Sequence, residues 1–304
     1  MRISILTGAA LLAGAICFGQ VMYAPKGEPA VYTAPHKPHT KLPEVKAAHS
    51  GQKSWRHLVV DDDRLRSEYV QAQPGFKTPR VYHPDTREWW VVWEGEVRFE
   101  IEATPPFVAK KGSMVQVPYQ TLYSWEVVGD KPALLFETNV AGARTIYEKN
   151  EGLPSLGPKM SWNPVTFPNR EIAKWQRNNK AHTTFEEVAK GVESGRLTGT
   201  QRIVEDDRGA ANFIYGYNSK LPPLDEKNRG HYHPEGAEYW FIMKGQIRYP
   251  IEKVGVVIAN EGDVVYVPKF TFHAPRWWGD GPSCRLAMNG FPYISHLFEP
   301  PKPK

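Results

Sequence analysis

Cysteine is almost missing from this chain, which has only Cys17 and Cys284 in 304 residues. If the N-terminal segment that carries Cys17 is removed on export, a single cysteine remains and no internal disulfide can form. The fold must then be stabilised by its core. We expect Cys284 to pack in that core as a small hydrophobic residue.

The chain also lacks an apolar run long enough for a comfortable transmembrane helix. Its apolar stretch, Ile3 to Ile16, follows Arg2 and is followed by small residues. We therefore expect residues 1–19 to be a signal peptide that sends the chain to a bacterial periplasm or out of the cell, with no stable membrane span in the mature chain. An uncleaved N-terminal anchor is the alternative that this pattern leaves open.

No cluster of like charge marks a polyanion-binding face. The net charge is +5, with some excess in a proline-rich leader over residues 20–56 and in the C-terminal tail. A nucleic-acid-binding protein would gather such charges on one surface, so no nucleic-acid partner is expected. The leader has no apolar period and is expected to be flexible or to lie as an arm on the surface.

Helical patterns are scarce, whereas aromatic residues, glycine and proline are frequent. This composition is typical of short strands joined by turns. In a connector over residues 151–200, Thr183 or Thr184 is predicted to cap a short helix over residues 185–197. Strands are predicted over residues 57–60, 89–93, 97–101, 114–117, 134–137, 201–204, 211–217, 239–243, 246–251, 264–267 and 271–275.

The most informative positive feature is a repeat with a constant offset of 150 residues. Many positions recur at that offset without a gap, which predicts two copies of one domain, over residues 57–150 and 201–300. The matched pairs include His83/His233, Glu88/Glu238, Trp90/Trp240, Gly95/Gly245, Arg98/Arg248, Gly112/Gly262, Pro118/Pro268 and Asn139/Asn289.

A metal-ligating pattern stands in the second copy. His231 and His233 are two residues apart, so on a strand both side chains leave the same face. Glu238 follows a tight turn, and His273 lies on a later segment that would approach from across the domain. Three imidazoles and one carboxylate suit one divalent transition ion such as Fe, Mn, Co, Ni, Cu or Zn and leave coordination positions open.

This arrangement resembles the two signature motifs of the cupin superfamily. The first is matched by His231, His233, Glu238 and Gly245, and the second by Gly262, Pro268 and His273, with Phe270 and Trp277 at places where the family often has glycine and asparagine. The His-x-His-Pro run is similar to germins. Two tandem copies resemble bicupins such as oxalate decarboxylases and ring-cleaving dioxygenases. The resemblance implies an all-β fold of two double-stranded β-helix, jelly-roll-like barrels with a short helical connector.

The first copy keeps His83 and Glu88 but has Val81 and Tyr123 at the other two ligand positions. Valine cannot bind a metal, and tyrosine would have to ionise. We therefore interpret the first copy as a scaffold with a degenerate metal site. Whether it binds another ligand stays open.

Strand alternation predicts which residues lie beside the ion. Arg229 is a candidate for gripping a substrate carboxylate, although an exposed arginine at the domain mouth is an equal interpretation. Glu235 and Tyr232 are candidate acid, base or hydrogen-bonding groups at the rim. Trp240, Phe272 and Trp277 are expected to form an aromatic wall, with core packing the commoner explanation for Trp240 and Trp277 the better pocket candidate.

Two classes of function are consistent with this pattern. The first is an exported metalloenzyme, most simply a dioxygenase-like oxidoreductase that acts on a small carboxylate or aromatic acid, with oxalate decarboxylation or oxidation and isomerisation as rival reactions. The second is a cupin that binds a metal or small ligand without turnover. The resemblance also implies a homodimer, paired through outer strands.

Overall fold

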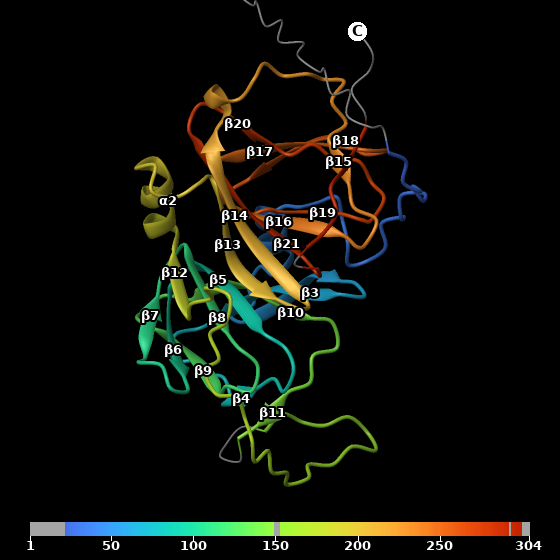
Figure 1. The fold of residues 1–304 in the computed structure, drawn as a ribbon. Helices are drawn as coiled ribbons and strands as arrows, with labels where there is room; N and C mark the ends of the chain where they lie inside the picture. Colours follow the sequence, from blue (N-terminus) through green and yellow to red (C-terminus); the bar gives the residue numbers. More distant parts are fainter. Residues whose placement is uncertain (1–21, 149–152, 292, 300–304) are drawn as a thin grey trace, which may run out of the picture.

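The computed structural model describes residues 22–148, 153–291 and 293–299. The predicted signal peptide, residues 1–19, lies outside these ranges. Strands dominate the described residues, and they form two similar domains, one below the other in Figure 1. None of the helices in the described ranges has the length and apolar character that crossing a membrane requires.

The N-domain, residues 55–147, is built from two facing sheets. One has the strand order β12-β8-β5-β10-β3-β2 and the other β11-β4-β9-β6-β7. The strands are β2 (Trp55–Asp61), β3 (Leu65–Ala72), β4 (Val81–Tyr82), β5 (Glu88–Glu94), β6 (Glu96–Ile101), β7 (Phe107–Ala109), β8 (Ser113–Val117), β9 (Tyr123–Val128), β10 (Ala133–Val140), β11 (Ile146–Tyr147) and, from the connector, β12 (His182–Thr184).

The C-domain, residues 200–298, repeats this plan. Its large sheet has the order β1-β19-β16-β21-β14-β13, and it is faced by β18-β17-β20 and by the pair β15-β22. The elements are β13 (Thr200–Asp206), β14 (Gly209–Tyr217), the 3-10 turn η1 (Asn218–Lys220), β15 (His231–Tyr232), β16 (Glu238–Lys244), β17 (Gln246–Ile251), β18 (Gly255–Asn260), β19 (Val264–Val267), β20 (Arg276–Trp278), β21 (Pro282–Asn289) and β22 (Leu297–Phe298).

The large sheets of the two domains pack against each other through one shared core. On β5, Trp89 and Trp93 point into this shared core, whereas Trp90 points into the interior of the N-domain. This is the period-two alternation of a strand whose two faces are both covered. The Ser67 and Tyr239 hydroxyls add a hydrogen bond of 2.6 Å between the domains. Burial of Cys284 in the shared core confirms its predicted role.

Each domain also receives a short strand from outside its own repeat. The leader contains β1 (His39–Thr40), which pairs with β19 of the C-domain, and the connector strand β12 pairs with β8 of the N-domain. In Figure 1 the blue leader accordingly lies beside the orange and red strands, and β12 lies among the green ones. Of the two expectations for the leader, an arm lying on the surface describes this part, because backbone hydrogen bonds to β19 hold it against the C-domain.

Both added strands lead into a helix. α1 (Leu42–Ala48) follows β1, and α2 (Phe185–Glu193) follows β12. The Thr184 side chain accepts a hydrogen bond from the backbone N–H of Glu187, which confirms the predicted cap and satisfies one of the free N–H groups at the helix start.

One predicted strand is wrong. Residues 271–275 contain only an isolated bridge at His273, and the regular strand β20 begins later, at Arg276. Pro275 has no N–H to give to a ladder, so regular pairing cannot run through it. The bridge at His273 nevertheless places this residue beside β15, where the predicted site lies.

Candidate metal centre

The first two predicted ligands lie on and just after β15. His231 and His233 turn to the same side of the extended chain, with ring centroids 4.9 Å apart. Tyr232, between them, turns to the other side and packs edge-to-face on Phe272 at 5.0 Å. The alternation that the sequence predicted is therefore present, and it separates Tyr232 from the imidazoles.

Backbone pairing brings the third histidine to the first. The N–H of His231 donates to the carbonyl of His273 at 3.1 Å, and the N–H of His273 donates back at 2.9 Å. Gly230 makes this approach feasible: it has a φ of +73°, and a Cβ there would lie 2.0 Å from the His273 carbonyl oxygen. The ring centroids of the two histidines are 4.5 Å apart.

The four predicted ligands converge. One ligating atom from each of His231, His233, Glu238 and His273 lies within 4.8 Å of all the others. Glu238 begins β16, and its Oε2 lies 2.9 Å from Nε2 of His233 and 3.4 Å from Nε2 of His273. His233, Glu238 and His273 are buried, and His231 is half-buried.

The hydrogen bonds of the rings leave their Nε2 atoms available. Nδ1 of His233 lies 2.6 Å from the carbonyl of Ser295, and Nδ1 of His273 lies 2.9 Å from the carbonyl of Thr271. A carbonyl only accepts, so each Nδ1 carries the proton and Nε2 of the neutral ring has a lone pair. Nε2 of His231 and of His273 are buried without a hydrogen-bond partner within the described residues. A divalent ion is the group that such atoms and a carboxylate fit.

The electrostatics favour the ligating forms of His231 and Glu238, whereas contact with the Glu238 carboxylate outweighs burial and raises the pKa of His233. Burial, reinforced by His273, lowers the pKa of His231 to about 2 and holds the ring neutral. Burial alone would raise the pKa of Glu238, but the adjacent His233 and His273 rings outweigh it, and the pKa lies well below its ordinary value. At neutral pH the cluster therefore presents a carboxylate among imidazoles.

Two of the three predicted catalytic side chains, Arg229 and Glu235, have polar protein partners of their own. Arg229 pairs with Glu252 at 2.7 Å, hydrogen-bonds to Glu299, and lies over the Phe272 ring. Glu235 accepts hydrogen bonds from the backbone and hydroxyl of Ser295. Their catalytic roles, and that of Tyr232, stay predictions.

A fourth histidine lies near the cluster and was not predicted from the sequence. The ring centroid of His296, just before β22, lies 4.7 Å from those of both His231 and His233. His296 is exposed, so it stands at the solvent side of the cluster. It is separated by more than 60 residues from the His-x-His motif, and no spacing rule links the two.

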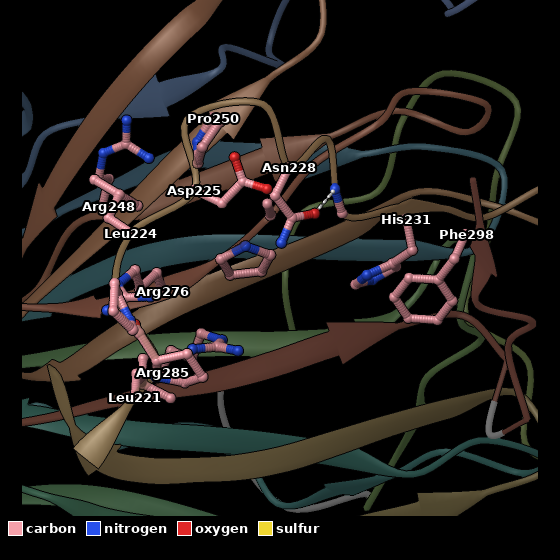
Figure 2. A pocket seen from close by; sticks show the side chains of 15 residues that line it. Leu221, Leu224, Asp225, Asn228, His231, Arg248, Pro250, Arg276, Arg285 and Phe298 are labelled. Carbon is pink, nitrogen blue, oxygen red and sulfur yellow. Dashed lines mark hydrogen bonds between the residues drawn. The ribbon is translucent and has the colours of Figure 1, made fainter. Parts of the chain in front are cut away.

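A cavity of about 440 Å³ begins at His231 and runs beneath the loop that follows η1. Figure 2 shows His231 and Phe298 at one end, and Arg276, Arg285 and Leu221 at the other. Trp240, predicted as a wall residue, packs edge-to-face on His273 at 5.2 Å. Trp277 lines an adjoining cavity of about 320 Å³ together with Arg285.

The two domains each match the same family, the cupin domain, over residues 68–139 and 219–288. The chain is a bicupin. No curated protein sequence matches it significantly.

Solved structures share this bicupin fold at low sequence identity. A salicylate 1,2-dioxygenase from Pseudaminobacter salicylatoxidans is 10% identical, with 86% of this chain and 88% of that chain covered and a TM-score of 0.62. A cupin 2 conserved barrel domain protein from Leptotrichia buccalis is 11% identical, with 82% and 90% covered and a TM-score of 0.52. These likenesses support the fold of both domains.

Proposed function

We propose that this bicupin is an exported, metal-dependent oxidoreductase that acts on a small carboxylate or aromatic acid. The observation that carries the proposal is the pair of buried Nε2 atoms, on His231 and His273, that have no hydrogen-bond partner among the described residues. They lie beside Glu238, and His231 stands at the end of a cavity. The similarity to a salicylate dioxygenase supports a dioxygenase-like reaction.

Each part of the site has a physical role in this proposal. His231, His233, Glu238 and His273 would hold one divalent ion, which would supply Lewis-acid and redox chemistry toward substrate and dioxygen. The Ser295 and Thr271 carbonyls fix two of the rings in the required tautomer. Because His231 forms part of the cavity wall, a substrate in the cavity would lie beside one of the four ligands.

The size of the cavity favours an acid larger than oxalate. A volume of about 440 Å³ lies in the range of sites for organic ligands with a carbon skeleton, and two directly joined carboxylates would leave most of it to water. Oxalate chemistry is therefore the second candidate, and it belongs in the same test.

The test combines metal analysis with substrate consumption. The full chain, expressed with its N-terminal segment and purified from the compartment it reaches, is analysed for bound metals. Oxygen uptake and carbon dioxide release are then recorded with oxalate, catechol, gentisate, salicylate and a flavonol. We expect about one equivalent of a transition metal and oxygen uptake with at least one aromatic substrate, both lost in His231→Ala.

Three other outcomes would contradict parts of the proposal. Metal retention without oxygen uptake or carbon dioxide release on any substrate would support a binding protein instead. Carbon dioxide release from oxalate alone would support the oxalate reaction. Recovery of the protein only from the cytoplasm would contradict export.

A further inference from the structure

The Arg285 side chain lies on the side of β21 that faces the interior of the C-domain. On β21 its neighbours Cys284 and Leu286 point into the core shared by the two domains, whereas Ala287 points into the C-domain interior. By the alternation of a strand, Arg285 points to the same side as Ala287. It is half-buried and lines both of the adjoining cavities.

Its guanidinium has no protein partner. Among the described residues no carboxylate or carbonyl pairs with Arg285, and its buried Nε has no acceptor. The other cavity arginines differ: Arg248 hydrogen-bonds to Glu226, and Arg276 hydrogen-bonds to Asn218 and the carbonyl of Pro222. A partly desolvated cation without a counter-charge is costly, and an organic anion that enters the cavity would remove that cost.

The register of the sheet fixes where this cation lies relative to the predicted ion. Arg285 pairs with Ile242 on β16, and the ligand Glu238 lies four residues earlier on that strand. Four residues of strand correspond to about 13 Å between backbone positions. Figure 2 shows the corresponding separation, with His231 and Arg285 toward opposite ends of the cavity. An anion held by Arg285 would thus have its far end toward the metal ligands.

The wall beside Arg285 is suited to a flat apolar body. Trp277 lines the adjoining cavity of about 320 Å³, which Arg285 also lines, and its indole N–H has no acceptor within the described residues. Gly216 permits the ring to lie there, because a Cβ at that position would approach the ring to 2.4 Å. A donor and an aromatic face therefore stand next to the free guanidinium.

The N-domain provides an internal comparison. At the repeat offset, the residue that corresponds to Arg285 is Leu135, which is fully buried in the N-domain core. The domain with the complete ligand set has the arginine, and the domain with Val81 and Tyr123 has leucine. The same fold thus accepts a leucine at this strand position.

We propose that Arg285 is the carboxylate-binding, specificity-determining residue of the C-domain, and that the cavity takes an aromatic monocarboxylate whose carboxylate contacts Arg285 and whose opposite edge faces His231. The reaction at that edge rests on the proposed function. Binding of the anion does not depend on it.

The experiment measures binding of benzoate to the full chain after removal of metals, by calorimetry, with benzyl alcohol as the neutral comparison. We expect benzoate to bind more tightly than benzyl alcohol. Arg285→Leu should weaken benzoate binding by about tenfold or more while leaving benzyl alcohol binding nearly unchanged. Arg285→Lys should restore part of the difference, because it keeps the charge without the bidentate geometry.

Arg196→Leu, which removes the same charge from an exposed position after α2, serves as the matched control and should bind benzoate like the original chain. Circular dichroism and metal content after reloading should be the same in all variants. Equal benzoate affinity in Arg285→Leu, or no benzoate binding to the original chain, would overturn the proposal. The binding assay uses no metal and no turnover. Its result can therefore be interpreted even if the protein has no oxidoreductase activity.

Discussion

The N-domain and the C-domain place the same scaffold around two different polar clusters. In the C-domain, His231 bridges to His273 through the backbone, and in the N-domain the corresponding pair is Val81 and Tyr123. The Tyr123 hydroxyl donates to Glu88 and lies 3.2 Å from Nε2 of His83. The N-domain cluster therefore satisfies its own polar atoms.

The difference between the clusters lies in which polar atoms have protein partners. In the N-domain, His83 lies 3.0 Å from Glu88, and burial with the Glu88 charge nearby raises the pKa of Tyr123, so its hydroxyl keeps the proton that it donates. In the C-domain, Nε2 of His231 and His273 have no such hydrogen-bond partner in the part of the chain that the structure describes. The Tyr123 hydroxyl thus makes the polar contacts in the N-domain that a bound ion would make in the C-domain. Ligand identity and missing hydrogen bonds together therefore identify a candidate metal site.

The largest effect is expected when one side chain is changed at the equivalent position of each domain. His273→Ala should lower metal affinity by about 100-fold or more, because it deletes a ligand from a buried site. Tyr123→Phe should leave the metal content unchanged. Elemental analysis after dialysis against a weak chelator measures both. Equal metal loss in the Tyr123 variant would show that the N-domain holds metal too.

A smaller effect on metal content is expected when the two missing ligands are introduced into the N-domain. The double variant Val81→His and Tyr123→His gives the N-domain the same four ligand types, at positions already paired in register. We expect a second equivalent of metal with weaker affinity, since only the ligands are changed and the side chains around them stay those of the N-domain. Neither single variant should gain metal.

Introducing the same pair into His273→Ala separates the two sites. This triple variant should regain about one equivalent of zinc, held by the N-domain. A folded triple variant without metal would show that the ligand set alone does not suffice, and that the remaining N-domain side chains exclude the ion.

The sequence could predict the ligands because they are specified by short motifs and a repeat. His231, His233 and Glu238 lie within eight positions, and strand alternation with one tight turn brings them together. The start of α2 at Thr184 was likewise encoded by neighbouring residues. Such features depend on local backbone geometry, which the residue types themselves determine.

Features that depend on distant pairings could not be predicted in this way. The pairing of the leader strand β1 with β19 joins residues more than 200 positions apart, and His296 approaches the cluster through the pairing of β22 with β15. Arg285 stands in an ordinary strand pattern, and only the structure shows that its guanidinium lacks a partner. These features follow from how the sheets assemble, which local patterns do not specify.

The smallest expected effect concerns a second chemical difference between the domains. Glu137 stands in the N-domain where the C-domain has Ala287, and its Oε2 accepts a hydrogen bond of 2.8 Å from the Trp90 indole. Burial, together with the nearby Glu88 carboxylate, raises the pKa of Glu137 to about 7. The folded chain therefore holds a proton on Glu137 at pH values where the unfolded chain has released it.

This proton gives a pH dependence of defined sign. Between the unfolded pKa near 4.5 and the folded value of about 7, the folded state binds more protons, so the free energy of unfolding falls as pH rises through that window. Relative to Glu137→Gln, the original chain should lose roughly 2–3 kcal/mol between pH 4.5 and 7.5. Glutamine can still accept the Trp90 hydrogen bond, so the packing is retained.

Urea unfolding at a series of pH values measures this difference, with Glu186→Gln, an exposed change on α2, as the control that should parallel the original chain. If the curves of the original chain and Glu137→Gln also run parallel, Glu137 is ionised in the folded state. The N-domain cluster would then carry a second buried carboxylate charge beside Glu88, balanced by the Arg56 guanidinium that pairs with Glu137, and the self-satisfied cluster inferred from the Tyr123 contacts would include this ion pair.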